Sequence, residues 1–427
     1  MTGELDVFLD GEPVGTMRQT SAGSVTFRYD DGYRGRNDAT PLSLSMPLTA
    51  PEHRNRVSRA FLAGLLPDSP GRLGELARQH RVSAANPFAL LTHIGRDAAG
   101  AVQLLPAGAE SDHAAQHQGD LDVLDDERLS EIVADIVANA DTWGRRETGA
   151  HWSLPGAQPK IALFRTDDGR WAIPRDATPT THILKPAVPP LSQHHVNEFV
   201  TMEAARTMGL DVADDFLLKT SAGDHVFVST RYDRAERDGR WRRLHQEDLC
   251  QAMGLLPDKK YQQDGGPGIA QFADLLWRLP DLDDRRESAR RFFEAIVFNV
   301  SALGTDAHAK NYSLLLSGTR ARLAPLYDLG THAPYPTPNG APMTAAMSVR
   351  GEYRMAQIRR DDLVAAGARL SLDPDEARET VERIRGALVP AFHAAAEVAS
   401  ATLADETGFA RAVADSVEAC AHTRGWV

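Results

Sequence analysis

Three polar residues in the last third of the chain constrain its fold more than any other feature. Asp306 stands five positions before Asn311, and Asp328 follows Asn311 by seventeen. Phosphoryl transfer from ATP needs such a set, because one carboxylate accepts the proton of the attacking hydroxyl while an amide oxygen and a second carboxylate hold the Mg²⁺ that neutralises the phosphates. The spacing therefore predicts a kinase-like catalytic loop, with Asp306 as the base and Asn311 and Asp328 as metal ligands.

The segments around these residues would bring them together. Residues 292–300 read as a buried helix, and residues 312–316 and 321–327 read as two short strands joined at Ser317-Gly318. A loop that leaves the helix and a loop that leaves the hairpin would then lie side by side. An isolated Asp and Asn at this spacing is more often a capped loop, whose side chains only satisfy backbone donors. The kinase interpretation therefore depends on whether other kinase parts occur upstream in the right order.

A turn of small residues, Ser153-Leu-Pro-Gly156-Ala-Gln-Pro-Lys160, lies between two predicted strands and is the candidate phosphate loop. Glycine lets backbone N–H groups approach phosphates closely, which is the basis of such loops. One glycine is a weak signal, and this stretch alone is more typical of a plain β-turn. Pro155 and Pro159 also lack N–H groups, which reduces the number of donors.

The lysine and the hinge of a kinase have counterparts further along the chain. Lys185 ends a short apolar strand, where a lysine can pair with the α- and β-phosphates, although alone it could equally be an edge lysine that reaches out to water. The predicted helix 197–208 offers Glu198 as its partner, with Glu203 as the alternative. Residues 226–234 form a strand that runs into a charged segment, where a kinase has its inter-lobe hinge. All parts follow one another in kinase order, which favours the kinase interpretation.

The first quarter of the chain carries no catalytic constellation. Residues 5–29 alternate in the period of strands, and residues 57–66 have the period of a helix. Residues 107–120 are polar, small and aperiodic, and make the best linker in the chain. We predict three units: an N-terminal domain over 1–120, a kinase N-lobe over 125–240 with the phosphate loop and the strand lysine, and a helical C-lobe over 241–427.

Composition limits the class of protein. A chain of 427 residues with 42% hydrophobic content can bury a large core. Its net charge of −12 and its pI of about 5.7 give no basic field for nucleic acid or an anionic membrane, so direct DNA binding is disfavoured. The start has no signal region, and no uncharged apolar run approaches the ~20 residues of a membrane span. We therefore expect a cytoplasmic protein without a membrane partner.

Cysteine and histidine give no metal or disulfide signal. Cys250 and Cys420 form no disulfide framework and no zinc spacing, and we expect both to be inert core residues. His113, His117 and the pair His194-His195 lack the spacing of a third ligand. A metal role for these histidines is therefore disfavoured.

Several motifs that are rare in combination are spread over the chain. They are Pro41-Leu-Ser-Leu-Ser-Met-Pro-Leu48, Leu65-Leu-Pro-Asp-Ser69, Ile94-Gly-Arg-Asp97 with Gly100-Ala-Val-Gln-Leu104, Gly156-Ala-Gln158, Thr180-Thr-His-Ile183, Gln246-Glu-Asp-Leu-Cys-Gln251, Lys260-Tyr-Gln-Gln-Asp-Gly-Gly-Pro-Gly-Ile269 and Thr305-Asp-Ala-His-Ala-Lys-Asn311. Together they resemble the HipA family, the kinase toxins of bacterial HipBA toxin–antitoxin modules. The resemblance runs over nearly the whole length.

The resemblance implies an α+β chain with a bilobal protein-kinase-like fold, a small β-rich N-terminal domain and a mostly helical C-terminal lobe. It implies a serine/threonine-protein kinase that uses ATP and Mg²⁺ and phosphorylates a protein, typically an aminoacyl-tRNA synthetase, which arrests translation and growth. The implied site residues are Asp306 as catalytic base, Asn311 and Asp328 as metal ligands and, for ATP, Gly156, Ala157, Gln158, Lys160, Lys185, Arg231, Tyr232, His308 and Lys310.

Regulation and partners are implied in the same way. The family phosphorylates a serine in its own phosphate loop, which corresponds to Ser153 and whose modification expels the loop and silences the kinase. Its partner is a small helix-turn-helix antitoxin. This antitoxin would contribute the DNA binding that the acidic chain lacks, so that operator DNA is bound only through it.

The chain departs from the family pattern at two places. Pro155 and Pro159 stand where the family usually has other residues, which bears on the geometry of the phosphate loop. The hinge reads Ser229-Thr-Arg-Tyr-Asp-Arg234, whereas an acidic residue usually precedes the Arg. Hinge recognition of adenine uses backbone groups, so this change is expected to alter fit more than function.

Two other functions stay open at this point. One is a catalytically silent relative that acts only as a scaffold or co-repressor, although such a protein would have no chemical reason to keep Lys185, Asp306, Asn311 and Asp328. The other is a small-molecule kinase of aminoglycoside-kinase type, which uses the same catalytic Asp and Asn. Mg²⁺-dependent ATP binding would separate the first from a kinase, and the identity of the phosphate acceptor would separate the second.

Overall fold

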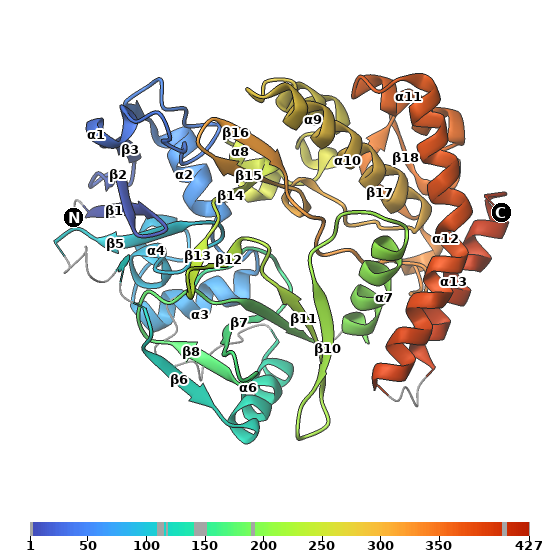
Figure 1. Cartoon of the computed structure of the whole chain (residues 1–427), viewed down its shortest axis with the longest axis horizontal. Coiled ribbons are helices and arrows are strands. Elements are labelled where there is room, and N and C mark those ends of the chain that lie inside the picture. The colour runs from blue at the N-terminus through green and yellow to red at the C-terminus, as the bar shows by residue number, and fades with distance from the viewer. Residues whose placement is uncertain are drawn as a thin grey trace.

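The computed structural model of the chain describes residues 3–108, 115–116, 118–140, 152–188, 193–403 and 408–426. The N-terminal elements lie at the upper left of Figure 1, and the long C-terminal helices lie at the right. His113 and His117 lie outside the described residues, as does half of the predicted linker. Among the helices of the described residues, none combines the length and the apolar character needed to cross a bilayer.

The N-terminal unit, residues 3–106, is an antiparallel sheet with helices packed on it. Its strands are β1 (Gly3–Leu9), β2 (Glu12–Gln19), β3 (Val25–Tyr29), β4 (Glu52–His53) and β5 (Val102–Pro106), in the order β4-β3-β2-β1-β5. Its helices are α1 (Asp31–Arg34), α2 (Asn55–Gly64), α3 (Pro70–His80) and α4 (Pro87–Ile94). Ser69 and Asn86 cap α3 and α4, each followed by a proline at the first helical position, which suits a helix start. The strands and the helix predicted in this part are confirmed.

The small lobe, residues 121–186 with 215–230, is a six-stranded antiparallel sheet that α6 (Asp126–Ala138) covers. Its strands are β6 (Leu121–Leu124), β7 (Ile161–Arg165), β8 (Trp171–Pro174), β9 (His182–Pro186), β10 (Asp215–Lys219) and β11 (His225–Thr230), in the order β10-β11-β9-β7-β8-β6. Asp125 caps α6 by accepting a hydrogen bond from the Arg128 amide. The strand predicted to carry Lys185 is the central strand β9.

The large lobe, residues 234–426, is mostly helical. Its strands are β12 (Arg234–Arg237), β13 (Arg240–Arg243), β14 (Gln246–Asp248), β15 (Ser313–Ser317), β16 (Arg320–Leu323), β17 (Thr344–Val349) and β18 (Glu352–Arg354). Its helices are α8 (Leu249–Ala252), α9 (Ile269–Leu276), α10 (Leu282–Ser301), α11 (Arg360–Arg369), α12 (Pro374–Leu403) and α13 (Phe409–Thr423). The predicted hairpin is β15 and β16, which pair antiparallel beside β14. The α+β fold class, with a β-rich start and a helical end, is thereby confirmed.

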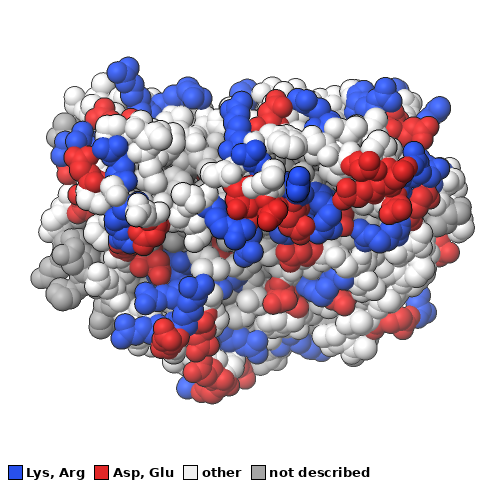
Figure 2. All heavy atoms as spheres, turned by 45° about the horizontal axis from the view of Figure 1, so that its top comes forward, with Lys and Arg blue, Asp and Glu red and all other residues white. Residues whose placement is uncertain are grey.

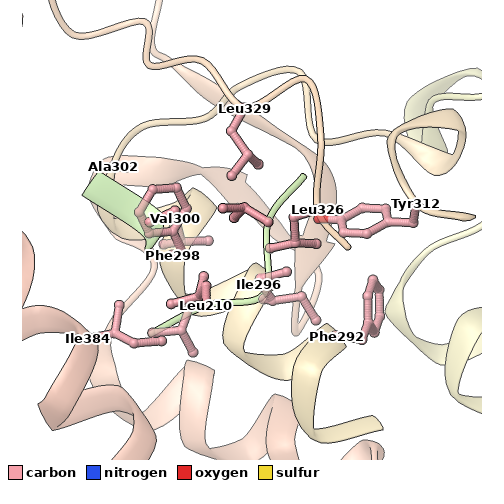
Figure 3. Close-up of a cluster of buried hydrophobic side chains, with 14 of the residues drawn as sticks. Leu210, Phe292, Ile296, Phe298, Val300, Ala302, Tyr312, Leu326, Leu329 and Ile384 are labelled. Carbon is pink, nitrogen blue, oxygen red and sulfur yellow. The ribbon is translucent and has the colours of Figure 1, made fainter. Parts of the chain in front are cut away.

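The core of the large lobe lies directly beneath the predicted catalytic residues. Phe292, Ile296 and Phe298 of α10 are buried in it, and Figure 3 shows them packed with Leu326 and Leu329 from the segment after β16. The two leucines flank Asp328, so the core fixes the backbone on both sides of this carboxylate. The hydrophobic effect thus positions a polar site on a rigid base.

Helix α7 (His194–Thr207) follows the small lobe in sequence but packs against the large lobe. Val196, Phe199 and Val200 belong to the same buried cluster as Ile384 and Phe392 of α12. Figure 1 shows α7 beside α12 and α13. The predicted boundaries at 120 and 240 remain a proposal, and the core assigns α7 to a different cluster from the strands that precede it.

Charged side chains are intermixed on the surface. On the face in Figure 2, Lys and Arg alternate with Asp and Glu over the whole width of the molecule. Cys250 is buried and Cys420 is partly buried, and both are free thiols. Burial raises the pKa of each thiol, which reduces its reactivity at neutral pH.

Candidate active site

The catalytic loop, residues 304–311, begins after α10 and ends in a 3₁₀ turn at Ala309–Asn311. The side-chain amide of Asn311 donates to the backbone carbonyl of Asp306 over 2.8 Å. This bond ties the predicted metal ligand to the predicted base and leaves the amide oxygen of Asn311 for a cation. The loop therefore holds Asp306 and Asn311 next to each other.

Asp306 presents its carboxylate to solvent, with 67% of the side chain exposed. The hydroxyl of Tyr261 donates to its Oδ1, and Nε2 of His308 lies 3.9 Å from the same oxygen. The ring of Tyr261 packs edge-on against His308, which fixes the donor. Burial lowers the pKa of His308 despite the nearby carboxylate, so this imidazole is neutral at physiological pH. An exposed, oriented carboxylate beside a cavity suits a general base.

Asp328 adopts a left-handed backbone conformation, with φ of +58°. Few residues other than glycine adopt it, although Asp is among those that do so more often. One carboxylate oxygen accepts a hydrogen bond from Nζ of Lys185 at 2.6 Å. Burial acts to raise the pKa of Asp328, but Lys185 and Lys160 outweigh it, and the pKa lies well below its ordinary value. The group is a carboxylate at any physiological pH.

Lys185 is held between two carboxylates. Its Nζ lies 2.6 Å from Oε1 of Glu198 and 2.6 Å from Oδ1 of Asp328. Glu203, the alternative partner, instead bonds to Arg206. Burial acts to lower the pKa of Lys185, but the charges of Asp328 and Glu198 raise it by more, so the ammonium stays charged. The sequence left two candidates for the lysine's partner, and Glu198 is the one that it contacts.

The phosphate loop, residues 153–160, turns at Gly156, where φ is +108°. The positive φ requires glycine at this position, and a Cβ atom here would also displace Nζ of Lys160. Lys160 donates to the carbonyl of Pro155 over 2.8 Å. Burial and the charge of Lys185 lower the pKa of Lys160 to about 8. The prolines on either side of Gly156 are thus accommodated in a tight turn that carries an ammonium group.

Ser153 differs from the other predicted site residues because its side chain is 1% exposed and lies outside the cavity. Its hydroxyl donates to the carbonyl of Leu65 over 2.7 Å. Its backbone amide donates to the carbonyl of Asp97 over 2.8 Å. Both acceptors belong to the N-terminal unit, which therefore holds the start of the phosphate loop.

Arg231 lies at the predicted hinge, but its side chain is committed elsewhere. The guanidinium bonds to both carboxylate oxygens of Asp233 and to the hydroxyl of Thr180, and it lies 3.5 Å from Asp97. Arg231 still lines the cavity. An ATP contact by its guanidinium would compete with these bonds to Asp233 and Thr180.

Tyr232 is the second predicted hinge residue. Its hydroxyl donates to Gln246 over 2.9 Å, and its ring is stacked on Tyr327 with centroids 5.5 Å apart. Both rings line the cavity, and their faces are apolar surface next to the hinge backbone. This arrangement suits the binding of a flat aromatic base.

One cavity of about 660 Å³ joins these groups, a volume in the usual range for small-molecule sites. Its lining includes every predicted site residue except Ser153: Gly156, Ala157, Gln158, Lys160, Lys185, Arg231, Tyr232, Asp306, His308, Lys310, Asn311 and Asp328. The amide oxygen of Asn311 and the oxygens of Asp328 are hard donors of the kind that Mg²⁺ prefers. Four lysines at the same cavity suit a polyphosphate. The residues therefore fit a Mg²⁺-nucleotide.

Three residues at the site carried no chemical prediction: Asp68, Lys260 and Tyr261. Asp68 lies within Leu65-Leu-Pro-Asp-Ser69, and the other two open Lys260-Tyr-Gln-Gln, so both stretches stood out only as motifs. Asp68 accepts hydrogen bonds from Lys310 and Lys260. Of the histidine pair that was set aside for metal, His194 lines the cavity and burial lowers its pKa.

Comparisons with known proteins agree with this geometry. The family described as HipA N-terminal domain matches residues 5–105, and the family described as HipA-like C-terminal domain matches residues 152–392. The chain is 37% identical over 339 residues to a Sinorhizobium fredii protein named "Putative kinase Y4mE", with 78% of each chain covered. It is 31% identical over 312 residues to the serine/threonine-protein kinase toxin HipA of Shewanella oneidensis, covering 68% of this chain and 66% of that one.

A solved structure has the same fold. It is the complex of HipA, HipB and operator DNA from Shewanella oneidensis MR-1, which matches with a TM-score of 0.78 and 23% sequence identity over 97% of each chain. The likeness therefore extends over the N-terminal unit and both lobes.

Proposed function

Because this chain belongs to the HipA family of kinase toxins, we propose that it transfers the γ-phosphoryl group of ATP to a serine or threonine hydroxyl of a protein. The observation that carries the proposal is the position of Lys185 between Glu198 and Asp328, at 2.6 Å from each, on the cavity that also holds Asp306 and Asn311. Protein kinases combine such a lysine and glutamate pair with a metal-binding Asp, a metal-binding Asn and a base.

The positions of the residues support the roles that we propose for them. Asp306 accepts the proton of the acceptor hydroxyl while that oxygen bonds to the γ-phosphorus and the bond to the β–γ bridging oxygen breaks, which leaves ADP. Tyr261 orients the carboxylate by its hydrogen bond. Lys185 pairs with the α- and β-phosphates and is kept charged by its two carboxylates. Mg²⁺ held by Asn311 and Asp328 would neutralise the charge on the phosphates.

The substrate class is proposed from the family resemblance. The proposed target is an aminoacyl-tRNA synthetase. Its phosphorylation would arrest translation and growth, which is how the toxins of this family act. Asp306 is exposed at the edge of the cavity, and an exposed base is accessible to a hydroxyl on a macromolecule.

Autophosphorylation of Ser153 is the proposed control of the site. The hydroxyl is buried against the carbonyl of Leu65, so the phosphate loop has to leave this position before the oxygen can react. A phosphoserine carries about −1.5 to −2 charge, which would be repelled by the carbonyls of Leu65 and Asp97 if the loop returned. The modified loop would therefore stay out, and its contacts with ATP would be lost. Mass spectrometry after incubation with ATP and Mg²⁺ tests this, and the absence of phosphate on Ser153 would remove the claim.

A helix-turn-helix antitoxin is the proposed partner. The Shewanella relative is solved in a complex with HipB and operator DNA. One protein chain of that complex has the fold of this chain. The intermixed charges in Figure 2 and the net charge of −12 offer no extended basic surface on that face. These two observations support operator binding through the antitoxin rather than by this chain alone.

The test of the proposed function is Asp306→Asn. The amide has the volume of the carboxylate but cannot accept the proton, so transfer should fall by at least about 10²-fold while nucleotide binding is kept. Phosphoproteomics of cells that express the wild type, Asp306→Asn or the control Asp361→Asn, which changes an exposed residue of α11, identifies the substrate at the same time. If Asp306→Asn kept most of its turnover, the assignment of the base would be wrong.

The same preparation separates the other two functions. A thermal shift with ATP that requires Mg²⁺ would argue against a silent scaffold or co-repressor. Transfer of phosphate to an aminoglycoside but to no protein would indicate a small-molecule kinase.

A further inference from the structure

A carboxylate of the N-terminal unit reaches into the cavity. Asp68 lies in the short connection between α2 and α3, and its side chain is 11% exposed. Its Oδ1 lies 2.5 Å from Nζ of Lys310, and its Oδ2 lies 3.4 Å from Nζ of Lys260. The two lysines come from the catalytic loop and from the segment before α9. One residue of the N-terminal unit thus bridges two separate segments of the large lobe.

The backbone around Asp68 is fixed on the side of the phosphate loop. Its amide donates to the carbonyl of Gly156 over 3.0 Å, and Pro67 pairs with Gly156 as an isolated parallel bridge. The next residue, Ser69, caps α3. The backbone that carries the carboxylate is therefore held in place by hydrogen bonds on either side of Asp68.

The charges explain why a carboxylate is needed at this place. Lys160, Lys185, Lys260 and Lys310 all line one cavity. Lys185 is neutralised by Glu198 and Asp328, whereas Lys310 and Lys260 meet at Asp68. Burial acts to raise the pKa of Asp68, but the charges of Lys310 and Lys260 lower it by more. The net pKa is below the ordinary value, so the group is ionised at neutral pH. A lysine has a long flexible stem, which an ion pair of this kind immobilises.

The two lysines also support the catalytic loop through their backbones. The carbonyl of Lys260 accepts a hydrogen bond from the amide of Ala309. The carbonyl of Lys310 accepts one from the hydroxyl of Tyr327. The backbone of Lys260 is therefore hydrogen-bonded to the loop that carries Asp306 and Asn311, and the backbone of Lys310 to the residue before Asp328.

We propose that Asp68 is a positioning residue of the phosphoryl-transfer site, which holds the ammonium groups of Lys310 and Lys260 toward the phosphates of the nucleotide. The N-terminal unit, which has its own sheet and core, then also contributes a residue to the kinase site. This proposal rests on the proposed function, since it takes a nucleotide as the occupant of the cavity.

The experiment compares Asp68→Asn and Asp68→Glu with wild-type protein of full length. The matched control is Asp38→Asn, which removes an exposed carboxylate of the same unit. In Asp68→Asn we expect the KM for ATP and the Kd for Mg²⁺-ADP to rise about tenfold, with a smaller fall in kcat, and in Asp68→Glu we expect partial recovery. Asp38→Asn should equal the wild type.

A second measurement, the chemical labelling of lysines, does not depend on kinase activity. An amine-reactive ester should label Lys310 several-fold faster in Asp68→Asn than in the wild type, because the ammonium has lost its partner. Lys185, held by its own two carboxylates, should stay protected and so reports that the variant is folded. If Lys185 becomes labelled in Asp68→Asn, that variant is misfolded. The KM, the Kd and the labelling of Lys310 in Asp68→Glu then test the proposal instead.

The outcomes are distinguishable. Unchanged KM, Kd and Lys310 labelling in Asp68→Asn would overturn the positioning role of Asp68. Faster Lys310 labelling with no nucleotide binding by the wild type would overturn both the phosphate-directed role and the proposed function, and would leave only a structural ion pair.

Discussion

Two buried clusters of charged side chains join the parts of this molecule. They differ in whether their cations can bind a further anion. The closed cluster is Asp97 and Asp233 with Arg231, Arg234 and Arg243. The open cluster is Asp68, Glu198 and Asp328 with Lys160, Lys185, Lys260 and Lys310. In the closed cluster no side chain is more than 8% exposed. Its guanidinium groups also donate to the carbonyls of Ala98, Gly100 and Ala177.

The choice of cation separates the two clusters further. Arginine stays protonated and makes several hydrogen bonds in fixed directions, which suits a permanent junction. Lysine is a compact point charge on a flexible stem and can exchange one anion for another. The open cluster faces a cavity of about 660 Å³, so its lysines can also bind a phosphate that enters the cavity. A buried charge network alone therefore does not indicate a functional site, whereas one with unused ligand atoms beside a cavity does.

The largest expected effect lies in the closed cluster. Asp97→Ala would leave three buried guanidinium groups facing a single carboxylate, and it should lower the free energy of unfolding by about 3–5 kcal/mol. Chemical denaturation measures this, with exposed Asp38→Asn as a control that should change stability by less than about 0.5 kcal/mol. A small effect of Asp97→Ala would show that the junction is not what holds the N-terminal unit in place.

In the open cluster, Asp328→Asn should act on ligand binding more than on stability. It removes one of the two anions beside Lys185 and the charge of the proposed metal ligand. We expect Mg²⁺-dependent nucleotide affinity to fall by about 10- to 100-fold, which corresponds to about 1.4–2.8 kcal/mol. Calorimetric titration with ADP in the presence and absence of Mg²⁺ measures it. An equal loss without Mg²⁺ would contradict a metal-ligand role.

A smaller effect is expected for Tyr261→Phe, which removes the hydroxyl from Asp306 and keeps the ring on His308. A hydrogen bond to a charged group contributes about 1.5–3 kcal/mol, and the lower end applies to an exposed carboxylate such as Asp306, so kcat should fall by about tenfold. The KM for ATP should not change, because the base is not part of nucleotide binding. Steady-state kinetics separate the two constants, and a rise in KM alone would show that Tyr261 does not act through Asp306.

The smallest effect is a pH dependence from Lys160, whose pKa is lowered to about 8. Below pH 8 this lysine is charged in the folded and the unfolded chain. Between pH 8 and its ordinary value of 10.5, the unfolded chain binds more protons, so stability rises with pH from this group. Nucleotide affinity should change in the opposite direction and fall a few-fold between pH 7 and pH 9, because the ammonium beside the phosphates is lost. Lys160→Arg should abolish that fall, and a Kd that stayed flat with pH in the wild type would contradict it.

The sequence predicted those parts of the site whose signals are local. Asp306, Asn311 and Asp328 lie within one stretch of chain, and their spacing indicated a shared role once the other kinase parts were found upstream in the right order. Lys185 at the end of an apolar strand gained its interpretation from the same order. The choice between Glu198 and Glu203 was left open by the sequence, because it depends on how α7 is rotated against the small lobe.

Side-chain partners from distant segments could not be predicted. Arg231 was expected to contact ATP from the hinge, but its guanidinium is taken by a network that includes Asp97, more than a hundred residues upstream. Asp68 was visible only as part of a motif, since no local pattern indicates that its partners are Lys260 and Lys310. Ser153 was expected in the loop, and its burial against Leu65 follows from packing between units.

The attachment of α7 to α12 has a consequence for the order of events during synthesis. Glu198 lies on α7, whose apolar residues pack on α12 and α13 in the large-lobe core. A chain emerging from the ribosome at about 5–20 residues per second would present Lys185 and Glu198 long before residues 374–403 exist. The main packing partner of the helix that carries Glu198 is therefore absent until those residues have been made. The lysine and glutamate pair thus gains the full support of the large-lobe core only late in synthesis, after the catalytic loop has been made.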